Sequence, residues 1–200
     1  MTQRYAIYAS GNALVDTEVE VSDAFLDRMG IGKGIMTLVD EARQHELVAA
    51  LNSETRVHRR ASGGSACNTA VAAQYFGART FYACRVADDD TGHFFVDDLR
   101  AAGVDTNMAS NKSTGVSGKC LVMITPDAER TMNTFLGISE TLSVDELDVA
   151  AVEKSHYVYI EGYLVSSTTG RAAAARPAGP ASSARRGAVR GNASVAAARC

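Results

Sequence analysis

Residues 62–70 read Ser62-Gly63-Gly64-Ser65-Ala66-Cys67-Asn68-Thr69-Ala70, and this stretch decides the fold more than any other part of the chain. An extended segment ends at the glycine pair, and a run of small residues typical of a helix follows and stops at Gly77. Glycine has no Cβ, so Gly63 and Gly64 let a ligand approach the main chain closely. Asn68, in the first helical turn, can both donate and accept hydrogen bonds beside unpaired backbone N–H groups. The pattern suits a polyhydroxylated small molecule; a plain strand-to-helix turn is the alternative.

The overall composition is that of an ordinary globular domain. The 200 residues are 46% hydrophobic and 22% charged, which suffices for one domain with a core. The sequence contains neither an apolar run long enough to span a bilayer nor the apolar core of a signal peptide. The four cysteines and four histidines are widely spaced, with no C-x-x-C or H-x-x-x-H pair. We therefore expect buried thiols, no metal site, no disulfide framework and a reducing, cytoplasmic location.

The last thirty residues differ in composition from the rest. Residues 171–200 contain twelve alanines, six arginines, three glycines and two prolines, and no acidic, aromatic, lysine, leucine or isoleucine residue. The net charge of −3 therefore divides into +6 for this tail and −9 for residues 1–170. The tail has too little apolar surface to offset the entropy of ordering it, so we expect disorder or a fraying helix. A basic arm for nucleic acid is disfavoured, because no aromatic residues alternate with the arginines to stack on bases.

A shift of reading frame explains the tail better. Alanine, arginine, glycine and proline are the residues that GC-rich codons yield when they are read out of frame. We therefore expect the chain to leave its true frame shortly after Gly170. Resequencing the coding region tests this, and an intact frame through codon 200 in a chain that folds and works would contradict it.

Strand and helix signals alternate over residues 1–170. Strands are predicted at residues 5–9, 17–21, 35–39, 57–62, 80–86, 119–124, 131–136 and 156–160. Helices are predicted after Asp40, over residues 65–76 and 91–102, and from a capping box at Ser143 to about residue 152. The alternation predicts an α/β fold with a parallel sheet flanked by helices, since parallel strands need helical crossovers. Segments at about 14–39 and 115–137 lack crossover helices, so we assign them to a small antiparallel lid.

Candidate ligand-binding residues follow the predicted strands. Asp16, Gly63, Gly64 and Glu161 each come just after a strand signal, and ligands of such sheets bind at the carboxyl ends of the strands. We therefore expect these residues to converge. A buried carboxylate that accepts two hydroxyls discriminates strongly against analogues that lack them. The alternative is that Asp16 is an ordinary turn or cap residue, and Asp88–Asp90 is a solvated loop rather than a Mg²⁺ site.

These motifs resemble the PfkB (ribokinase-like) family of carbohydrate and nucleoside kinases. Residues 62–70 together with Gly77 match the N-terminal signature of the family. The segment Gly11-Asn12-Ala13-Leu14-Val15-Asp16 resembles its first substrate-binding element. The segment Asp88-Asp89-Asp90-Thr91-Gly92 resembles the stretch that usually follows the signature, although Ala87 stands where a glycine is typical.

The resemblance covers about residues 4–170 and points to one branch of the family. Met36–Asp40 and Glu129–Gly137 look most like bacterial members that are grouped with adenosine kinase. The glycine–asparagine signature is specific, and the other stretches support it. The resemblance implies the N-terminal part of a ribokinase-like domain, with the C-terminal half of the fold missing.

The family implies ATP-dependent phosphorylation of a hydroxymethyl group on a sugar or nucleoside, with ATP and Mg²⁺ as cofactors of the intact member. By resemblance, the substrate-binding residues are Asn12, Asp16, Gly63, Gly64, Asn68 and Glu161. Asp16 would accept hydrogen bonds from sugar hydroxyls, and Asn68 would bind a neighbouring hydroxyl. Glu161 matches a substrate-contacting position of the ribokinase branch. The lid would exclude water, which phosphoryl transfer needs in order to avoid hydrolysis.

The general base of the family has no counterpart in this sequence. It is an aspartate in a C-terminal glycine-rich motif, and the anion hole and nucleotide-binding elements that accompany it are also missing. No G-x-x-x-x-G-K-[ST] motif replaces them. We therefore expect an acceptor-binding half with no catalytic residue, no ATP site and no kinase activity of its own. We also expect an unpaired sheet edge and exposed apolar surface.

Two other functions stay open. A non-catalytic sugar- or nucleoside-binding or dimerisation module would bind ribose or adenosine without turnover. A dinucleotide-binding protein is disfavoured, because no G-x-G-x-x-G follows the first strand. The expected partner is a small-molecule sugar or nucleoside, with no nucleic acid and no membrane, and the lid is a candidate for a homodimer contact. The acceptor itself is left open among adenosine-like, ribose-like and other furanose compounds.

Overall fold

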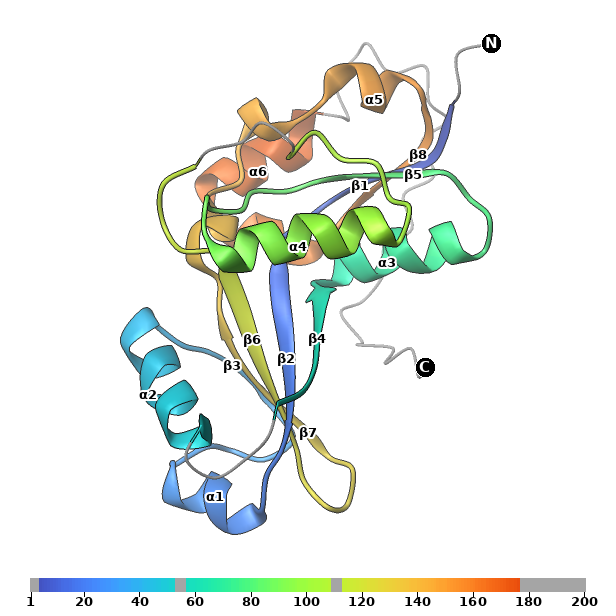
Figure 1. Cartoon of the computed structure of the whole chain (residues 1–200). Helices are drawn as coiled ribbons and strands as arrows, with labels where there is room; N and C mark the ends of the chain where they lie inside the picture. Colours follow the sequence, from blue (N-terminus) through green and yellow to red (C-terminus); the bar gives the residue numbers. More distant parts are fainter. Residues whose placement is uncertain (1–3, 53–56, 109–112, 177–200) are drawn as a thin grey trace.

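Two β-sheets organise the chain in the computed structural model, which describes residues 4–52, 57–108 and 113–176 (Figure 1). The strands are β1 (Tyr5–Ser10), β2 (Leu14–Glu20), β3 (Met36–Leu38), β4 (Val57–Gly63), β5 (Thr80–Ala83), β6 (Gly118–Ile124), β7 (Arg130–Phe135) and β8 (Ser155–Ile160). The α-helices are α1 (Asp23–Arg28), α2 (Glu41–Asn52), α3 (Ser65–Tyr75), α4 (Asp90–Ala101), α5 (Val149–Glu153) and α6 (Thr168–Ala175). Short 3-10 helices are η2 (Gly137–Thr141), η3 (Val144–Glu146) and η4 (Gly162–Ser166).

The core sheet has the order β5-β1-β8, and both of its pairings are parallel. Successive side chains of a strand point to opposite faces, so helices can bury both sides of such a sheet. Tyr8 stacks on Phe81, with ring centroids 5.3 Å apart, on the face that α5 and α6 cover. Tyr82 lies on the other face, in a cluster with residues of α3 and α4. This arrangement confirms the predicted parallel core flanked by helices.

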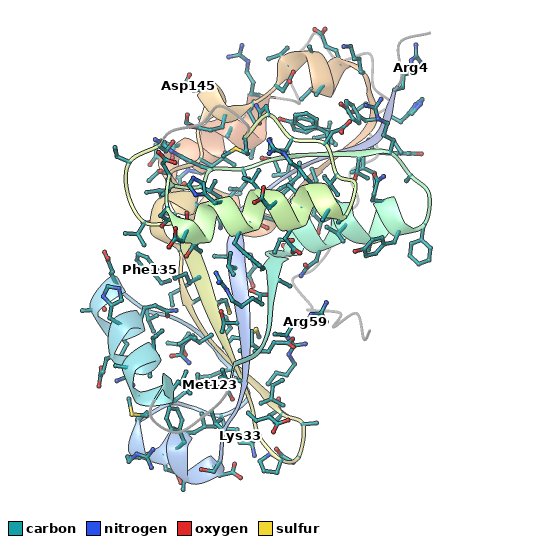
Figure 2. The ribbon with its side chains drawn as sticks, in the orientation of Figure 1. Arg4, Lys33, Arg59, Met123, Phe135 and Asp145 are labelled. Carbon is teal, nitrogen blue, oxygen red and sulfur yellow. The ribbon has the colours of Figure 1, made fainter. Side chains whose placement is uncertain are left out.

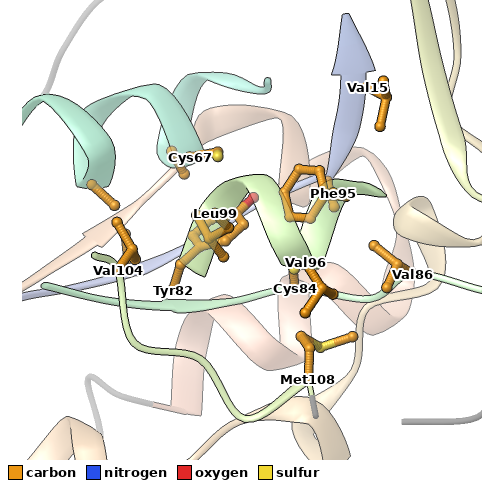
Figure 3. Close-up of a cluster of buried hydrophobic side chains, with 14 residues drawn as sticks. Val15, Cys67, Tyr82, Cys84, Val86, Phe95, Val96, Leu99, Val104 and Met108 are labelled. Carbon is orange, nitrogen blue, oxygen red and sulfur yellow. The ribbon is translucent and has the colours of Figure 1, made fainter. Parts of the chain in front are cut away.

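A second buried cluster lies between the core sheet and the helices α3 and α4 (Figure 3). Cys67 on α3, Cys84 just after β5 and Leu99 on α4 are fully buried in it. Val15 of β2 reaches the same cluster from the neighbouring sheet. Each fully buried side chain of this size contributes about 1.5–3 kcal/mol to folding. Cys67, Cys84 and Cys120 are free and buried, as the spacing of the cysteines predicts.

The second sheet extends away from the core and forms the lid, with the order β3-β7-β6-β2-β4 (Figure 1). β6 and β7 form the predicted antiparallel hairpin, and β2 and β4 are also antiparallel. However, β2 runs parallel to β6, and β3 runs parallel to β7. The lid sheet is therefore mixed rather than antiparallel, and it includes β4, which lies outside the expected lid segments at 14–39 and 115–137. The difference arises because the pairing of β2 with β6 joins segments far apart in the sequence.

Helices α1 and α2 cover one face of the lid. Leu47 of α2 and Phe25 of α1 are buried against Val19 and Leu121 of the sheet. Asp40 caps α2, as predicted, because its Oδ1 accepts the N–H of Arg43 at 2.8 Å. Asp16 lies on the opposite face of the lid, together with the buried side chains of Cys120 and Thr134.

Lys33 ties together the end of the lid that lies farthest from the core (Figure 2). Its Nζ lies 2.7 Å from the Oδ1 of Asp23 and 2.8 Å from the Oδ2 of Asp127. The first contact belongs to α1 and the second to the turn between β6 and β7. These pairs are exposed, so each contributes little to stability, but together they fix the turn against α1.

The predicted helix from Ser143 to about residue 152 is divided into η3 and α5. The capping box itself is confirmed, since the Glu146 carboxylate accepts the Ser143 N–H at 2.7 Å. Leu147 then turns into an extended conformation and is buried in the core. Asp148 caps a new helix by accepting the N–H of Ala151 at 2.9 Å. A second cap residue within the apolar pattern therefore restarts the helix.

Helix α6 runs beyond residue 170. Ser167 caps it by accepting the N–H of Gly170 at 2.9 Å, and Ala173 is buried against the core. The first residues of the alanine-rich tail are thus helical and packed, because alanine has the highest helix propensity and a small side chain. Residues 177–200 lie outside the described residues, so the expected disorder or frame shift there stays a prediction.

Strand β8 has apolar side chains in contact with solvent. Among the described strands it pairs only with β1. Tyr157 is 65% exposed, and Tyr163 and Val165 in the following η4 are 47% and 56% exposed. This agrees with the expected unpaired edge and exposed apolar surface. Within the described ranges, none of the helices is long and apolar enough to cross a membrane.

Candidate ligand-binding site

The candidate site lies where two lid strands join the core. β1 ends at Ser10 and continues through Gly11, Asn12 and Ala13 into β2, while β4 ends at Gly63 directly before α3. Leu14 pairs with Gly63, so the two connections lie side by side. The fold therefore brings the connection through Gly11, Asn12 and Ala13 next to the glycine pair Gly63-Gly64, as expected from the positions of the strand ends.

Gly64 provides the closest approach between these connections. Its φ is 98°, in the region that side chains rarely adopt, and a Cβ there would overlap the carbonyl oxygen of Asn12. Only glycine therefore permits this turn from β4 into α3. The predicted need for glycine at this position has a direct backbone cause.

Asp16 lies inside β2, between Ala61 of β4 and Cys120 of β6. It was expected just after the first strand, but the strand that starts at Leu14 includes it. Its half-buried carboxylate lies against the α-carbon of Gly63, where a Cβ would overlap both carboxylate oxygens. Gly63 thus leaves the space that the carboxylate occupies.

The Asp16 carboxylate has no hydrogen-bond or ion-pair partner among the described residues. Burial raises its pKa to about 6, and the attraction of Arg130 opposes this while the charge of Glu18 adds to it. Arg130 itself bonds to Glu18 at 3.2 Å rather than to Asp16. The carboxylate is therefore desolvated and free to accept hydrogen bonds from a ligand.

Asn12 carries a second unused acceptor at the same junction. The residue is only 4% exposed, and its backbone N–H donates to the carboxylate of Glu161 at 2.7 Å. Its side-chain Oδ1 is buried without a partner among the described residues. Buried polar atoms are nearly always paired, so this oxygen is a candidate acceptor for a hydrogen bond from a ligand.

Asn68 lies on the first turn of α3, as predicted, and its side chain is exposed. Its backbone N–H donates to the carbonyl of Gly64 at 2.9 Å, which closes the first turn. The side-chain amide has no hydrogen-bond partner in the part of the chain that the structure describes. It is therefore available to a ligand at the open end of α3.

Glu161 follows β8 directly and is only 3% exposed. Its carboxylate accepts from the N–H of Asn12, the hydroxyl of Ser65 and the N–H of Ala66 at 2.7, 3.0 and 3.2 Å. Burial raises the pKa of this carboxyl, and the three hydrogen bonds oppose the rise. The structure thus places Glu161 beside the site, but both carboxylate oxygens already have protein donors.

Cys120 and Thr134 also belong to this region, and the sequence analysis did not select them. Asp16 pairs with Cys120, and Cys120 pairs with Thr134, so the three side chains share one face of the lid. The Thr134 hydroxyl donates to the Cys120 Sγ at 3.3 Å. Burial raises the pKa of Cys120 to about 12, with a contribution from Asp16, so the thiol is neutral. Only the pairing of β2 with β6, which local patterns do not reveal, identifies these neighbours.

Asp89 stabilises the point where another lid strand begins. Its carboxylate caps α4 through the N–H of Gly92 and also accepts both the N–H and the hydroxyl of Ser117 at 2.9 and 2.6 Å. Burial acts to raise the pKa of Asp89. The hydrogen bonds from Ser117 and Gly92 outweigh burial, so the pKa lies below its ordinary value. Among the described residues, no group of three or more His, Cys, Asp or Glu side chains could hold a metal ion. The bonds to Gly92 and Ser117 identify Asp89 as the cap of α4 that also holds the start of β6.

The profile of the pfkB family carbohydrate kinases matches residues 29–178, three quarters of the chain. The chain belongs to the pfkB family. Its structure is similar to that of the adenosine kinase from Sinorhizobium meliloti, with 34% identity over 88% of this chain and a TM-score of 0.78. It is also similar to a probable sugar kinase from Rhizobium etli, with 32% identity over 89% of this chain and a TM-score of 0.79.

A curated relative supports the same assignment. An uncharacterized sugar kinase from Archaeoglobus fulgidus is 24% identical over 88 residues, which cover 44% of this chain and 35% of that protein. This chain covers 52% of each of the two solved kinases. It therefore spans about half the length of the structures it matches, in agreement with a partial ribokinase-like fold. The predicted family and fold class are confirmed.

Proposed function

We propose that the described residues form the acceptor-binding part of a pfkB-type kinase. The intact kinase would transfer a phosphoryl group from ATP to a hydroxymethyl group of a sugar or nucleoside. The observation that carries this proposal is the unpartnered Asp16 carboxylate, held against the bare α-carbon of Gly63. A fold that buries a carboxylate without a partner leaves it ready for a ligand that donates hydrogen bonds.

Each candidate residue has a distinct proposed role. Ionised Asp16 accepts hydrogen bonds from one or two ligand hydroxyls, and the orphan Oδ1 of Asn12 accepts from another. The exposed amide of Asn68 contacts a neighbouring hydroxyl. Gly63 and Gly64 allow the ligand to lie close to the main chain. Together these groups recognise several hydroxyls on a small ring, as a sugar or a nucleoside presents them.

The lid has a proposed role in excluding water. One face carries Asp16, Cys120 and Thr134, and we place the ligand on this side, while α1 and α2 cover the other face. Exclusion of water from the acceptor limits the hydrolysis that competes with phosphoryl transfer. We place this activity in the cytoplasm, where the three buried free thiols would stay reduced.

We propose that the ATP–Mg²⁺ pair of the family is not held by the described residues. They contain no cluster of possible metal ligands, and Asp89 is engaged in capping α4 and binding Ser117. We therefore assign no step to the nucleotide here. We propose that the described residues bind the acceptor and that the nucleotide belongs to other parts of the family fold.

Calorimetry with ribose and adenosine tests the proposal. The 200-residue chain should bind at least one of them, and Asp16→Asn should lower the affinity by about tenfold or more, the effect of losing a hydrogen bond to a charged group. Asp145→Asn is the matched control, because Asp145 is exposed on the core away from the lid (Figure 2). Equal affinities of the Asp16→Asn variant and the parent chain would refute the proposal.

The alternative function is a sugar- or nucleoside-binding or dimerisation module without chemistry. A kinase assay on the same chain with adenosine or ribose separates the two functions when it is compared with an intact family member. We expect no ATP turnover by the 200-residue chain, because no segment of its sequence resembles the motif that carries the general base of the family. Turnover that depends on the acceptor would contradict this expectation.

We also propose that the edge of the lid is the contact of a homodimer. Strand β3 pairs with β7 on one side only, among the described strands. Ile35 and Leu38, in and beside β3, are 54% and 59% exposed. An apolar edge strand is a ready template for pairing with a second copy.

A further inference from the structure

Glu161 connects three segments that are far apart in the sequence. Its Oε1 accepts the N–H of Asn12, in the link from β1 to β2, at 2.7 Å. Its Oε2 accepts the hydroxyl of Ser65 at 3.0 Å and the N–H of Ala66 at 3.2 Å, both on the first turn of α3. Its own N–H donates to the carbonyl of Ser10 at 3.2 Å. One side chain at the end of β8 thus holds the ligand-binding link against the ligand-binding helix.

Helix α3 has no cap of its own. The residue before it is Gly64, which has no side chain to accept the unpaired N–H groups of the first turn. The Glu161 carboxylate takes this role from a distant part of the chain by accepting the Ala66 N–H. A negative charge at the N-terminus of a helix is also stabilised by the helix dipole.

The Glu161 carboxylate is buried and already bonded to the protein through both of its oxygens. The residue is 3% exposed, and both carboxylate oxygens have protein donors at hydrogen-bond distance. A Cβ at Gly11 would overlap Glu161 Oε2 and also approach Ala66 too closely. Glycine at position 11 therefore creates the space in which the carboxylate sits between the two segments.

We infer that Glu161 is a positioning residue, which fixes Asn12 and the first turn of α3 relative to each other, and not a residue that contacts the ligand. This differs from the role that the family resemblance implies for this position. The link carries the orphan Oδ1 of Asn12, and the helix carries the Asn68 amide. Glu161 would therefore affect ligand binding only through these two residues. The part of this inference that concerns ligand binding rests on the proposed function.

The first test needs no ligand. Glu161→Gln keeps the size of the side chain but replaces one acceptor oxygen with a donor nitrogen. Hydrogen exchange of the Asn12 and Ala66 amides should become about tenfold faster or more, the effect expected when a charged hydrogen bond is lost. The Asn12 amide proton resonance should also move upfield as its short bond to the carboxylate is lost. The Tyr82 amide, which donates to Asp105 at 2.8 Å, is the control and should not change.

Unchanged exchange at both Asn12 and Ala66 would overturn the inference. If Glu161→Gln does not fold, Ser65→Ala gives the same test in a milder form, since it removes only one of the three donors. It should speed exchange at Ala66 with less effect on Tyr82. Equal protection of Ala66 in this variant and in the parent chain would count against the inference.

The second test uses adenosine and its 2′-deoxy and 3′-deoxy analogues in calorimetry. A positioning residue should weaken all three ligands by the same factor when it is changed to Gln. A direct contact would instead lose its effect with the analogue that lacks the contacted hydroxyl, and that result would overturn the inference. If the parent chain binds neither adenosine nor ribose, the proposed function fails, while the exchange experiment still decides the role of Glu161.

Discussion

Asp16 combines a cost in stability with a proposed role in binding. The carboxylate is half-buried beside Gly63, and no described residue offers it a hydrogen bond or an ion pair. Its pKa of about 6 in the folded chain lies above the ordinary value of 3.8. A raised pKa means that the folded state favours the protonated form, so this group destabilises the fold as pH rises through about 6. Residues held in such a state are typical of functional sites.

Asp16→Asn should therefore stabilise the chain at pH 8. A rise of about two pKa units corresponds to about 3 kcal/mol at most, and the partial exposure of the side chain reduces this to about 1 kcal/mol. Urea unfolding at pH 8 and pH 4 measures the effect, which should be present at pH 8 and nearly absent at pH 4. A variant that is less stable than the parent chain at pH 8 would show that the carboxylate has a partner after all.

The raised pKa of Asp16 also implies that ligand binding depends on pH. Ionised Asp16 accepts hydrogen bonds from hydroxyls better than the protonated form does. The affinity for adenosine or ribose should fall as pH drops below about 6, approaching tenfold for each pH unit. Titration calorimetry between pH 5 and pH 8 measures this fall, and Asp16→Asn serves as the control that should show little slope. A constant affinity in the parent chain would argue against Asp16 as the binding group.

Gly63 and Gly162 form a matched pair for substitution by alanine. A Cβ at Gly63 would overlap the Asp16 carboxylate, whereas a Cβ at Gly162 meets nothing within 4 Å. Gly63→Ala should displace Asp16 and cost about 1–3 kcal/mol of stability, as overpacking does, and also lower ligand affinity. Gly162→Ala should change stability by less than about 0.5 kcal/mol. Thermal unfolding and calorimetry of both variants check this, and equal behaviour of the two would contradict the packing shown here.

At the scale of elements, the strongly patterned segments could be predicted and the distant pairings could not. Alternating apolar residues predict the β6–β7 hairpin, and the cap at Asp40 predicts α2, because both signals are local. The mixed order of the lid depends on the pairing of β2 with β6, which no local pattern encodes. Helix α1 has only six residues, and although Ser22 caps it through the Phe25 N–H, so short an apolar pattern gives no periodicity.

Local sequence patterns likewise predict some residues of the candidate site, whereas others are recognised only from the three-dimensional structure. Gly63 and Gly64 could be predicted, because glycine pairs before a helix have a local backbone cause. Asp16 could be proposed as a binding residue, but its place inside a strand depends on where β2 begins. Cys120 and Thr134 become neighbours of Asp16 only through the order of the lid strands. The distant capping of α3 by Glu161 is likewise visible only in three dimensions.

The exposed edge strand β3 of the lid leads to a prediction about the proposed homodimer. Leu38→Glu should convert the proposed homodimer into a monomer, because a charge on an exposed apolar edge opposes pairing between copies. Sedimentation of the parent chain and of the variant measures this. The Val149→Glu variant is a control. Val149 is also about half exposed, but it lies on α5, which covers the core sheet and not the lid. A parent chain that sediments as a monomer at all concentrations would rule the contact out.

The described residues form a parallel core and a lid, and the candidate ligand site lies between them. The described residues match about half of the length of two solved kinases, and the β8 edge has exposed tyrosines. Four backbone connections join the lid to the core, and glycines at positions 64, 118 and 137 let them pack against one another. The proposed ligand site lies at this junction, so we expect its shape to depend on the position of the lid.

A crystal structure of the chain with adenosine or ribose bound would show whether Asp16 and Asn12 hold the ligand. We predict ligand hydroxyls at hydrogen-bond distance, about 2.6–3.2 Å, from the Asp16 carboxylate and from the Oδ1 of Asn12. We also predict that Glu161 keeps its bonds to Asn12 and Ala66 and does not touch the ligand. A ligand that binds elsewhere, with Asp16 left unpaired, would contradict the proposed site.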